Sequence, residues 1–108
     1  MTGKILDALD IDEYDLLRME VQFDEKLIRL EVESPDEEER KVRLLFKGVN
    51  SFYTNRPGLI VHPESRIYLL LWEQVQQLYR VDMFFDIGNP GTAFILSISF
   101  ETIEVTFN

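Results

Sequence analysis

Apolar side chains recur at every second position through most of this chain, and this spacing restricts its fold more than any other feature of the sequence. The odd positions of Leu17–Phe23 are apolar and the even positions polar, while Ile28–Val32 repeats the alternation. Successive side chains of a strand point to opposite faces, so the pattern indicates half-buried strands. It predicts about six strand segments. They are Tyr14–Phe23, Lys26–Glu33, Arg40–Lys47, Val81–Ile87, Phe94–Phe100 and Ile103–Phe107.

Short polar segments separate these strands and indicate where the sheet turns. Only Asp24–Glu25 lies between the first two runs, which predicts a tight hairpin, and Gly88–Gly91 is a strong turn signal. Gly48 follows the third run, where we expect a bulge or a bend. The apolar positions change from even to odd at Glu101–Thr102. Because a one-residue slip exchanges the faces of a strand, we expect a bulge or sharp corner there.

One segment has the apolar spacing of a helix. It predicts an amphipathic helix over Glu64–Tyr79, with Pro63 suited to its first turn, although a strand through Ile67–Trp72 stays open as the alternative. Gly3–Leu9 is expected to form a short N-terminal helix. The predicted fold is therefore α+β: a curled, mostly antiparallel sheet of about six strand segments, one main helix (about 64–79) and a short N-terminal helix. The apolar stripe of the main helix comprises Ile67, Leu70, Leu71, Val75 and Leu78.

The length of 108 residues fits a single domain, 1–108, that can bury its own core. The chain has no cysteine, which excludes disulfides, zinc–thiolate sites, iron–sulfur clusters and thiol catalysis. The start of the chain, Met1–Asp10, lacks the pattern of a secretory signal peptide. The longest apolar run, Ile67–Trp72, is too short to span a membrane. We therefore expect a cytoplasmic protein with no membrane partner and no cofactor.

The net charge is −9, and it is unevenly distributed. Residues 1–40 hold fourteen acids and five bases, whereas residues 41–108 hold six of each. The whole net charge therefore belongs to the N-terminal third. An acidic surface repels phosphates, which argues against nucleic acid as a partner. A mildly basic cluster of Arg40, Lys41, Arg43 and Lys47 is more simply explained by cross-strand pairing with Glu31 and Glu33.

Few residues suggest chemistry. His62 is the only histidine, and a catalytic role would need Glu64 to orient it and Ser51 or Ser65 as nucleophile, but no nucleophile-elbow pattern accompanies it. A single histidine also cannot supply the ligand sets that zinc or non-haem iron prefers. The acids Asp10, Asp12, Glu13 and Asp15 begin like a calcium loop but lack its glycine and its final glutamate. We therefore expect no catalytic residue and no metal site.

Two strand segments resemble a known group of domains. Val42–Val49 ends in "F-x-G-V", and Ser97–Val105 is similar to the closing strand of the same families. These are small, uncharacterised bacterial domain families, some of which are assigned as immunity proteins of polymorphic toxin systems. The resemblance implies a protein that binds another protein, and it brings no catalytic residues.

The sequence therefore predicts a non-catalytic protein-binding domain. Its specific form is an immunity-type inhibitor whose acidic face meets a basic toxin, because electrostatic complementarity speeds encounter. Two alternatives stay open: a homodimeric structural or assembly module, and a small-molecule-binding or enzymatic curled-sheet domain. Tyr68 and Trp72 are candidate apolar anchors on one flank of the expected helix. The acidic candidates are Asp10, Asp12, Glu13, Asp15, Asp36, Glu37, Glu38 and Glu39.

Overall fold

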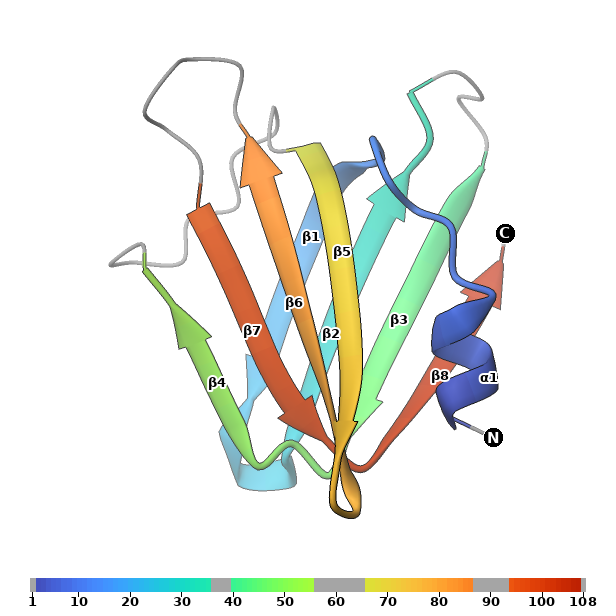
Figure 1. The fold of residues 1–108 in the computed structure, drawn as a ribbon. Helices are drawn as coiled ribbons and strands as arrows, with labels where there is room; N and C mark the ends of the chain where they lie inside the picture. The colour runs from blue at the N-terminus through green and yellow to red at the C-terminus, as the bar shows by residue number, and fades with distance from the viewer. Residues whose placement is uncertain (1, 36–39, 56–65, 87–93, 108) are drawn as a thin grey trace.

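The computed structural model describes residues 2–35, 40–55, 66–86 and 94–107, which form one short α-helix and eight strands (Figure 1). No helix in these ranges is long and apolar enough to cross a bilayer. The elements are α1 (Thr2–Asp7), β1 (Asp15–Gln22), the 3₁₀ turn η1 (Phe23–Glu25), β2 (Leu27–Glu33), β3 (Lys41–Lys47), β4 (Ser51–Thr54), β5 (Arg66–Val75), β6 (Leu78–Asp86), β7 (Phe94–Phe100) and β8 (Thr102–Phe107).

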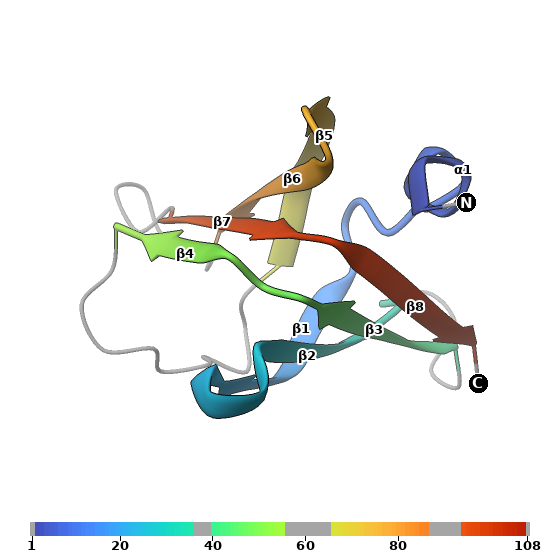
Figure 2. The same cartoon turned by 90° about the horizontal axis from the view of Figure 1, so that it is seen from below.

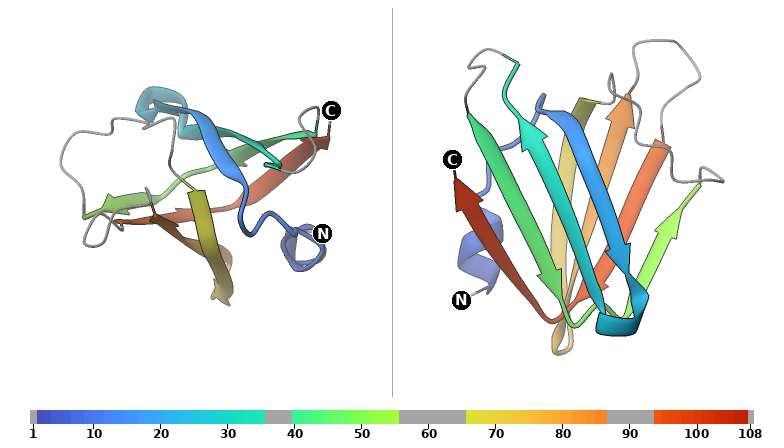
Figure 3. Two further views of the ribbon diagram at one scale, coloured as in Figure 1. Left: turned by 90° about the horizontal axis from the view of Figure 1, so that it is seen from above. Right: turned by 180° about the vertical axis from the view of Figure 1, so that it is seen from behind.

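All eight strands belong to one sheet in the order β4-β7-β6-β5-β1-β2-β3-β8, and every pairing is antiparallel. The sheet is not closed, since β4 and β8 end the order. It curls into two facing layers, with β1, β2, β3 and β8 in one and β4, β5, β6 and β7 in the other (Figures 2 and 3). The curled, mostly antiparallel sheet is confirmed, with more strands and less helix than predicted.

The two layers are joined at a corner where two long strands bend together. β3 runs on into β4 through Gly48, and β7 runs on into β8 through Glu101. The amide of Glu101 donates to the carbonyl of Lys47 at 3.0 Å, and the amide of Asn50 donates to that of Ser99 at 2.8 Å. Both bends expected from the sequence are confirmed, and they face each other across one pair of strands.

Gly48 has the left-handed φ of +64°, so we expect Gly48→Ala to lower the free energy of unfolding by about 1–2 kcal/mol. A Cβ at Gly48 would also lie 2.7 Å from Cγ of Glu101, but this side chain is exposed and can turn away. Urea unfolding followed by circular dichroism measures the change. Glu101→Ala in the same background removes the clash, and Gly48→Asn tolerates the left-handed region better. Full recovery of stability in the Gly48→Ala/Glu101→Ala double variant would contradict the backbone explanation.

A second corner joins β1 to β5 at a single point. The amide of Ile67 donates to the carbonyl of Tyr14 at 2.9 Å, and the only paired residues of the two strands are Asp15 and Arg66. Beyond this point the strands diverge, and the β5–β6 hairpin stands away from β1 and β2 (Figure 3). Within the part of the chain that the structure describes, β5 from Leu69 onward pairs with β6 alone.

The predicted helix over residues 64–79 is wrong: this segment holds β5, the turn at Gln76 and the start of β6. A bulge between Ile67 and Leu69 explains the misleading pattern. It inserts one extra residue, so the inward side chains fall at Ile67, Leu70 and Trp72, and a strand acquires a helix-like spacing of three. The strand alternative for Ile67–Trp72 is therefore the correct one.

The core lies between the two layers and is built from the alternating residues of the strands. In β1, a bulge between Leu16 and Arg18 buries Leu16 and exposes Leu17, so the predicted inward position of Leu17 is wrong. Phe23 was also expected inside, but it lies in η1 and is 71% exposed. Among the described residues, the buried apolar side chains are Leu6, Ile11, Tyr14, Leu16, Ile28, Leu30, Val32, Val42, Leu44, Phe46, Ile67, Val81, Met83, Phe85, Leu96, Ile98, Phe100 and Ile103.

A row of aromatic rings crosses this core and ends at the helix. Phe46 in β3 meets Phe100 edge-on with centroids 4.8 Å apart, and Phe100 stacks with Tyr79 at 6.2 Å. Tyr79 lies 6.3 Å from Trp72. α1 packs against β8 and covers the end of this row, since a Cβ on Gly3 would lie 3.6 Å from Cη2 of Trp72. The predicted N-terminal helix is confirmed, and its place beside β8 is visible in Figure 1.

Candidate functional site

The outer surface of the β5–β6 hairpin carries three exposed apolar side chains beside the half-buried Phe84. We name these four residues the apolar face: Tyr68, Leu69, Leu71 and Phe84. The bulge in β5 turns both Tyr68 and Leu69 outward, where they are 50% and 37% exposed. Leu71 is 51% exposed, and Phe84 lies opposite Leu69 in β6 with its ring 6.1 Å from that of Tyr68. Contiguous exposed apolar side chains are typical of contact surfaces.

The charges beside the apolar face are matched within the hairpin and its neighbour β7. Arg80 forms an ion pair with Glu73 at 2.5 Å and a second with Asp82 at 3.4 Å. The hydroxyl of Ser97 donates to the other carboxylate oxygen of Asp82 at 2.5 Å. The apolar face therefore has an approximately neutral border in a chain whose net charge is −9.

The two candidate anchors lie on opposite sides of β5. Tyr68 is part of the apolar face, while Trp72 points inward, is half-buried and packs against the core. They cannot share one flank of a helix, because the segment that holds them is a strand. Tyr68 therefore remains available to a partner, and Trp72 is committed mainly to the aromatic row and α1.

The N-terminal acids lie in the segment between α1 and β1 and at the start of β1. Asp10, Asp12 and Glu13 are exposed, whereas Asp15 is held by Arg66 at 3.0 Å. We name the three exposed residues the acidic turn. No three acidic or histidine side chains among the described residues are placed to hold a metal ion. Asp36, Glu37, Glu38 and Glu39 lie outside the described residues, as does His62.

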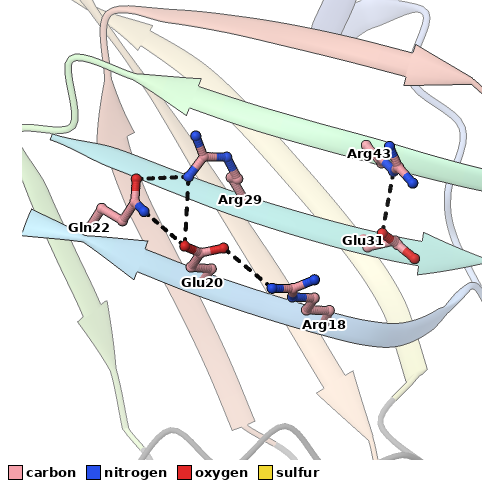
Figure 4. Close-up of polar contacts among 6 residues, drawn as sticks. All are labelled: Arg18, Glu20, Gln22, Arg29, Glu31 and Arg43. Carbon is pink, nitrogen blue, oxygen red and sulfur yellow. Dashed lines mark hydrogen bonds and ion pairs between the residues drawn. The ribbon is translucent and has the colours of Figure 1, made fainter. Parts of the chain in front are cut away.

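A second polar surface covers the outside of the layer formed by β1, β2, β3 and β8 (Figure 4). Glu31 lies opposite both Arg18 and Arg43 and binds Arg43 at 3.3 Å. Arg29 donates to Gln22 at 2.7 Å and lies 3.8 Å from Glu20. A shallow hollow of about 390 Å³ lies over this surface.

The cross-strand ion pairs predicted for the basic residues are confirmed for Arg43, whereas Lys47 has a different partner. Arg43 pairs with Glu31, and Lys41 lies opposite Glu33 in the register. Lys47 pairs with Glu104 of β8 at 2.5 Å. Exposed ion pairs such as these each contribute at most about 1 kcal/mol to stability. Their main effect is that acidic neighbours neutralise the positive charges of Arg43 and Lys47.

The interior offers no group of converging polar side chains in the part of the chain that the structure describes. Among the described residues, the buried polar ones are Thr2 in α1 and Ser34 directly after β2. A catalytic or small-molecule site needs several polar groups directed at one point. The apolar face and the acidic turn are therefore the surfaces on which a function can be argued.

Fold and site together define a curled antiparallel sheet whose outer β5–β6 surface is apolar and whose α1–β1 connection is acidic. A comparison with models of known protein families and a search of curated proteins both found no match to this chain.

Proposed function

We propose that the chain is a non-catalytic domain that binds another protein through the apolar face. The observation that supports this most strongly is the exposure of Tyr68, Leu69 and Leu71 on one surface of the hairpin. Aromatic and large aliphatic side chains at the centre of a neutral patch provide most of the affinity in protein interfaces. The matched charges of Arg80 and Asp82 fit the polar rim of such an interface.

The acidic turn indicates the charge of the partner. Its three residues precede Asp15, which pairs with Arg66 at the start of β5, so the acidic turn lies near the apolar face. A basic partner would be attracted to the acidic turn and then bind the apolar face. An immunity-type inhibitor of a basic toxin is the form of this function that the strand motifs favour.

Neutralising the acidic turn with Asp10→Asn, Asp12→Asn and Glu13→Gln should slow association with a basic partner about tenfold at low salt and leave dissociation nearly unchanged. The partner is first recovered by cross-linking and mass spectrometry, and the rates are then measured with the purified pair. The control removes the same charge from other exposed sites by Asp24→Asn, Glu25→Gln and Glu101→Gln. Equal association rates for both triple variants would reject steering by the acidic turn. An unchanged dissociation rate in Leu71→Lys would show that the apolar face is not the binding surface.

A further inference from the structure

We propose that the N-terminal helix belongs to a strap that opens while the sheet stays folded. The strap is Thr2–Asp10, which comprises α1 and the three residues after it. In its closed position it lies on the side where the β5–β6 hairpin and β8 diverge (Figure 2). The inference goes beyond the proposed function and does not depend on it, because it concerns the chain without a partner.

The closed strap contacts both layers of the sheet. α1 packs against β8 in one layer. In the other layer, a Cβ on Gly3 would lie 3.6 Å from Cη2 of Trp72 and 3.7 Å from Cε1 of Tyr79, so the helix passes close to both rings. Leu6 is buried and belongs to the core. The strap therefore covers this side of the core with apolar contacts.

Apolar packing alone attaches the strap to the sheet. In the part of the chain that the structure describes, no hydrogen bond or ion pair joins the strap to a strand. The backbone bonds at the end of the strap stay within it: the amide of Ala8 donates to the carbonyl of Lys4, and that of Leu9 to the carbonyl of Leu6. Apolar contacts are not directional, so the strap can separate without breaking a polar network.

The chain is fixed to the sheet directly after the strap. The amide of Glu13 donates to the carbonyl of Ile67 in β5, and the amide of Tyr14 donates to the carbonyl of the buried Ile11. Glu13 has the left-handed φ of +71°, which a residue with a side chain adopts where its surroundings hold it. This turn is a fixed point. Leu9–Asp10, which lies before it without regular structure, is the hinge.

The small size of α1 favours opening. Its six residues are too few to form a helix that is stable alone, so the released strap unfolds and gains backbone entropy. Gly3 lowers the helix propensity of the segment further. The strands keep all their ladder bonds when the strap leaves. Elements held by few contacts open at a lower free energy than the core strands, and the strap is such an element.

Opening also removes support from the β5–β6 hairpin. Trp72 and Tyr79, the two rings beside Gly3, belong to β5 and β6. In the described ranges, β5 from Leu69 onward pairs with β6 alone, so the closed strap adds inward support that β1 does not give. A hairpin held in one position loses less entropy when its apolar face binds a partner. This last step alone rests on the proposed function.

The absence of native cysteine permits a direct test by thiol labelling, because a buried thiol reacts only when its site opens. Leu6→Cys in the strap should react at least about 100-fold faster than Leu44→Cys in β3, since both residues are buried but only β3 is paired on both edges. If Leu44→Cys does not fold, the smaller change Val42→Cys in the same strand replaces it. Equal rates would overturn the proposal, because strap and sheet would then open together.

A second substitution separates opening of the strap from unfolding of the sheet. Gly48→Ala weakens the corner between the layers, so it should accelerate labelling of Leu44→Cys about tenfold and leave that of Leu6→Cys unchanged. Gly3→Ala should slow labelling of Leu6→Cys about threefold, because alanine favours the helix and its Cβ fits beside Trp72. Equal acceleration of both labelling rates by Gly48→Ala would contradict independent opening.

Hydrogen exchange provides a measurement that leaves Leu6 in place. The amides of Ala8 and Leu9 should exchange equally fast with and without Gly48→Ala, while those of β3 accelerate. Failure of this inference is distinguishable from failure of the proposed function. A strap that opens only with the sheet, in a chain that binds its partner through the apolar face, would overturn this inference alone. A strap that opens independently, in a chain whose apolar face binds no protein, would reject the proposed function alone.

Discussion

Phe100→Ala is expected to lower the free energy of unfolding by about 3–5 kcal/mol, the largest effect of any substitution considered for this chain. Phe100 is completely buried at the end of β7, immediately before the bend at Glu101. Its ring contacts Phe46 of the opposite layer and Tyr79 of the neighbouring strand. The substitution therefore removes two ring contacts and leaves a cavity at the point where the two layers join.

Urea unfolding monitored by circular dichroism measures the Phe100→Ala loss. Phe107→Ala is the control, because Phe107 is exposed and should cost less than about 0.5 kcal/mol. If Phe100→Ala does not fold, Phe100→Leu is the second variant, because leucine keeps most of the side-chain volume. It should lower the free energy of unfolding by about 1.5 kcal/mol, less than Phe100→Ala. A loss in Phe100→Ala no larger than that in Phe107→Ala would show that the aromatic row does not join the layers.

Trp72→Ala should lower the free energy of unfolding by about 2 kcal/mol or more, whereas Tyr68→Ala should change it by less than about 0.5 kcal/mol. The two aromatic residues lie in the same strand but on opposite faces. Trp72 packs against Tyr79 and α1, and the cavity left by alanine would loosen the helix as well as β5. Tyr68 contacts Phe84 on the open surface, where solvent replaces the lost contact at little cost.

Thermal and urea unfolding of both variants check this contrast, with circular dichroism as the signal because Trp72 is the only tryptophan. Affinity for the partner protein supplies the second readout. Tyr68→Ala should weaken this binding while leaving stability unchanged, and Trp72→Ala should lower stability. The reverse result, an unstable Tyr68→Ala and a stable Trp72→Ala, would mean that the two faces of β5 are assigned the wrong way round.

The strands without a bulge were predictable because their apolar and polar residues alternate strictly, and each apolar residue then points to the core. β2 and β3 follow the predicted pattern, with Ile28, Leu30 and Val32 inward opposite their outward charged neighbours. The bends at Gly48 and Glu101 were also predictable, since a left-handed glycine and a change of parity are local signals. These features depend on neighbours within a few residues.

The bulges defeat sequence analysis because one extra residue changes the spacing on which the prediction depends. The bulge in β1 buries Leu16 in place of Leu17, and the bulge in β5 gives its inward residues the spacing of a helix. The four-residue strand β4 was also missed, because Ser51–Thr54 is too short to show a period. Its partner β7 lies far away in the sequence, and only that pairing makes it a strand.

The apolar face could be found in the sequence only as a surplus of large side chains. The run Ile67–Trp72 holds more apolar residues than one face of a strand can bury, which shows that some of them must be exposed. Which ones are exposed depends on the bulge in β5, which the sequence does not mark. The charge asymmetry was visible directly, but its position beside β5 required the Asp15–Arg66 corner.

The pairing of β3 with β8 has a consequence for synthesis of the chain. Val42 is paired with Phe107 and Lys47 with Thr102, so one edge of β3 stays unpaired until β8 has been translated. Until β8 has been synthesised, this edge of β3 is unpaired, and unpaired edges can associate with other chains. Because β7 continues into β8 through the bend at Glu101, pairing of β7 with β6 brings β8 next to β3.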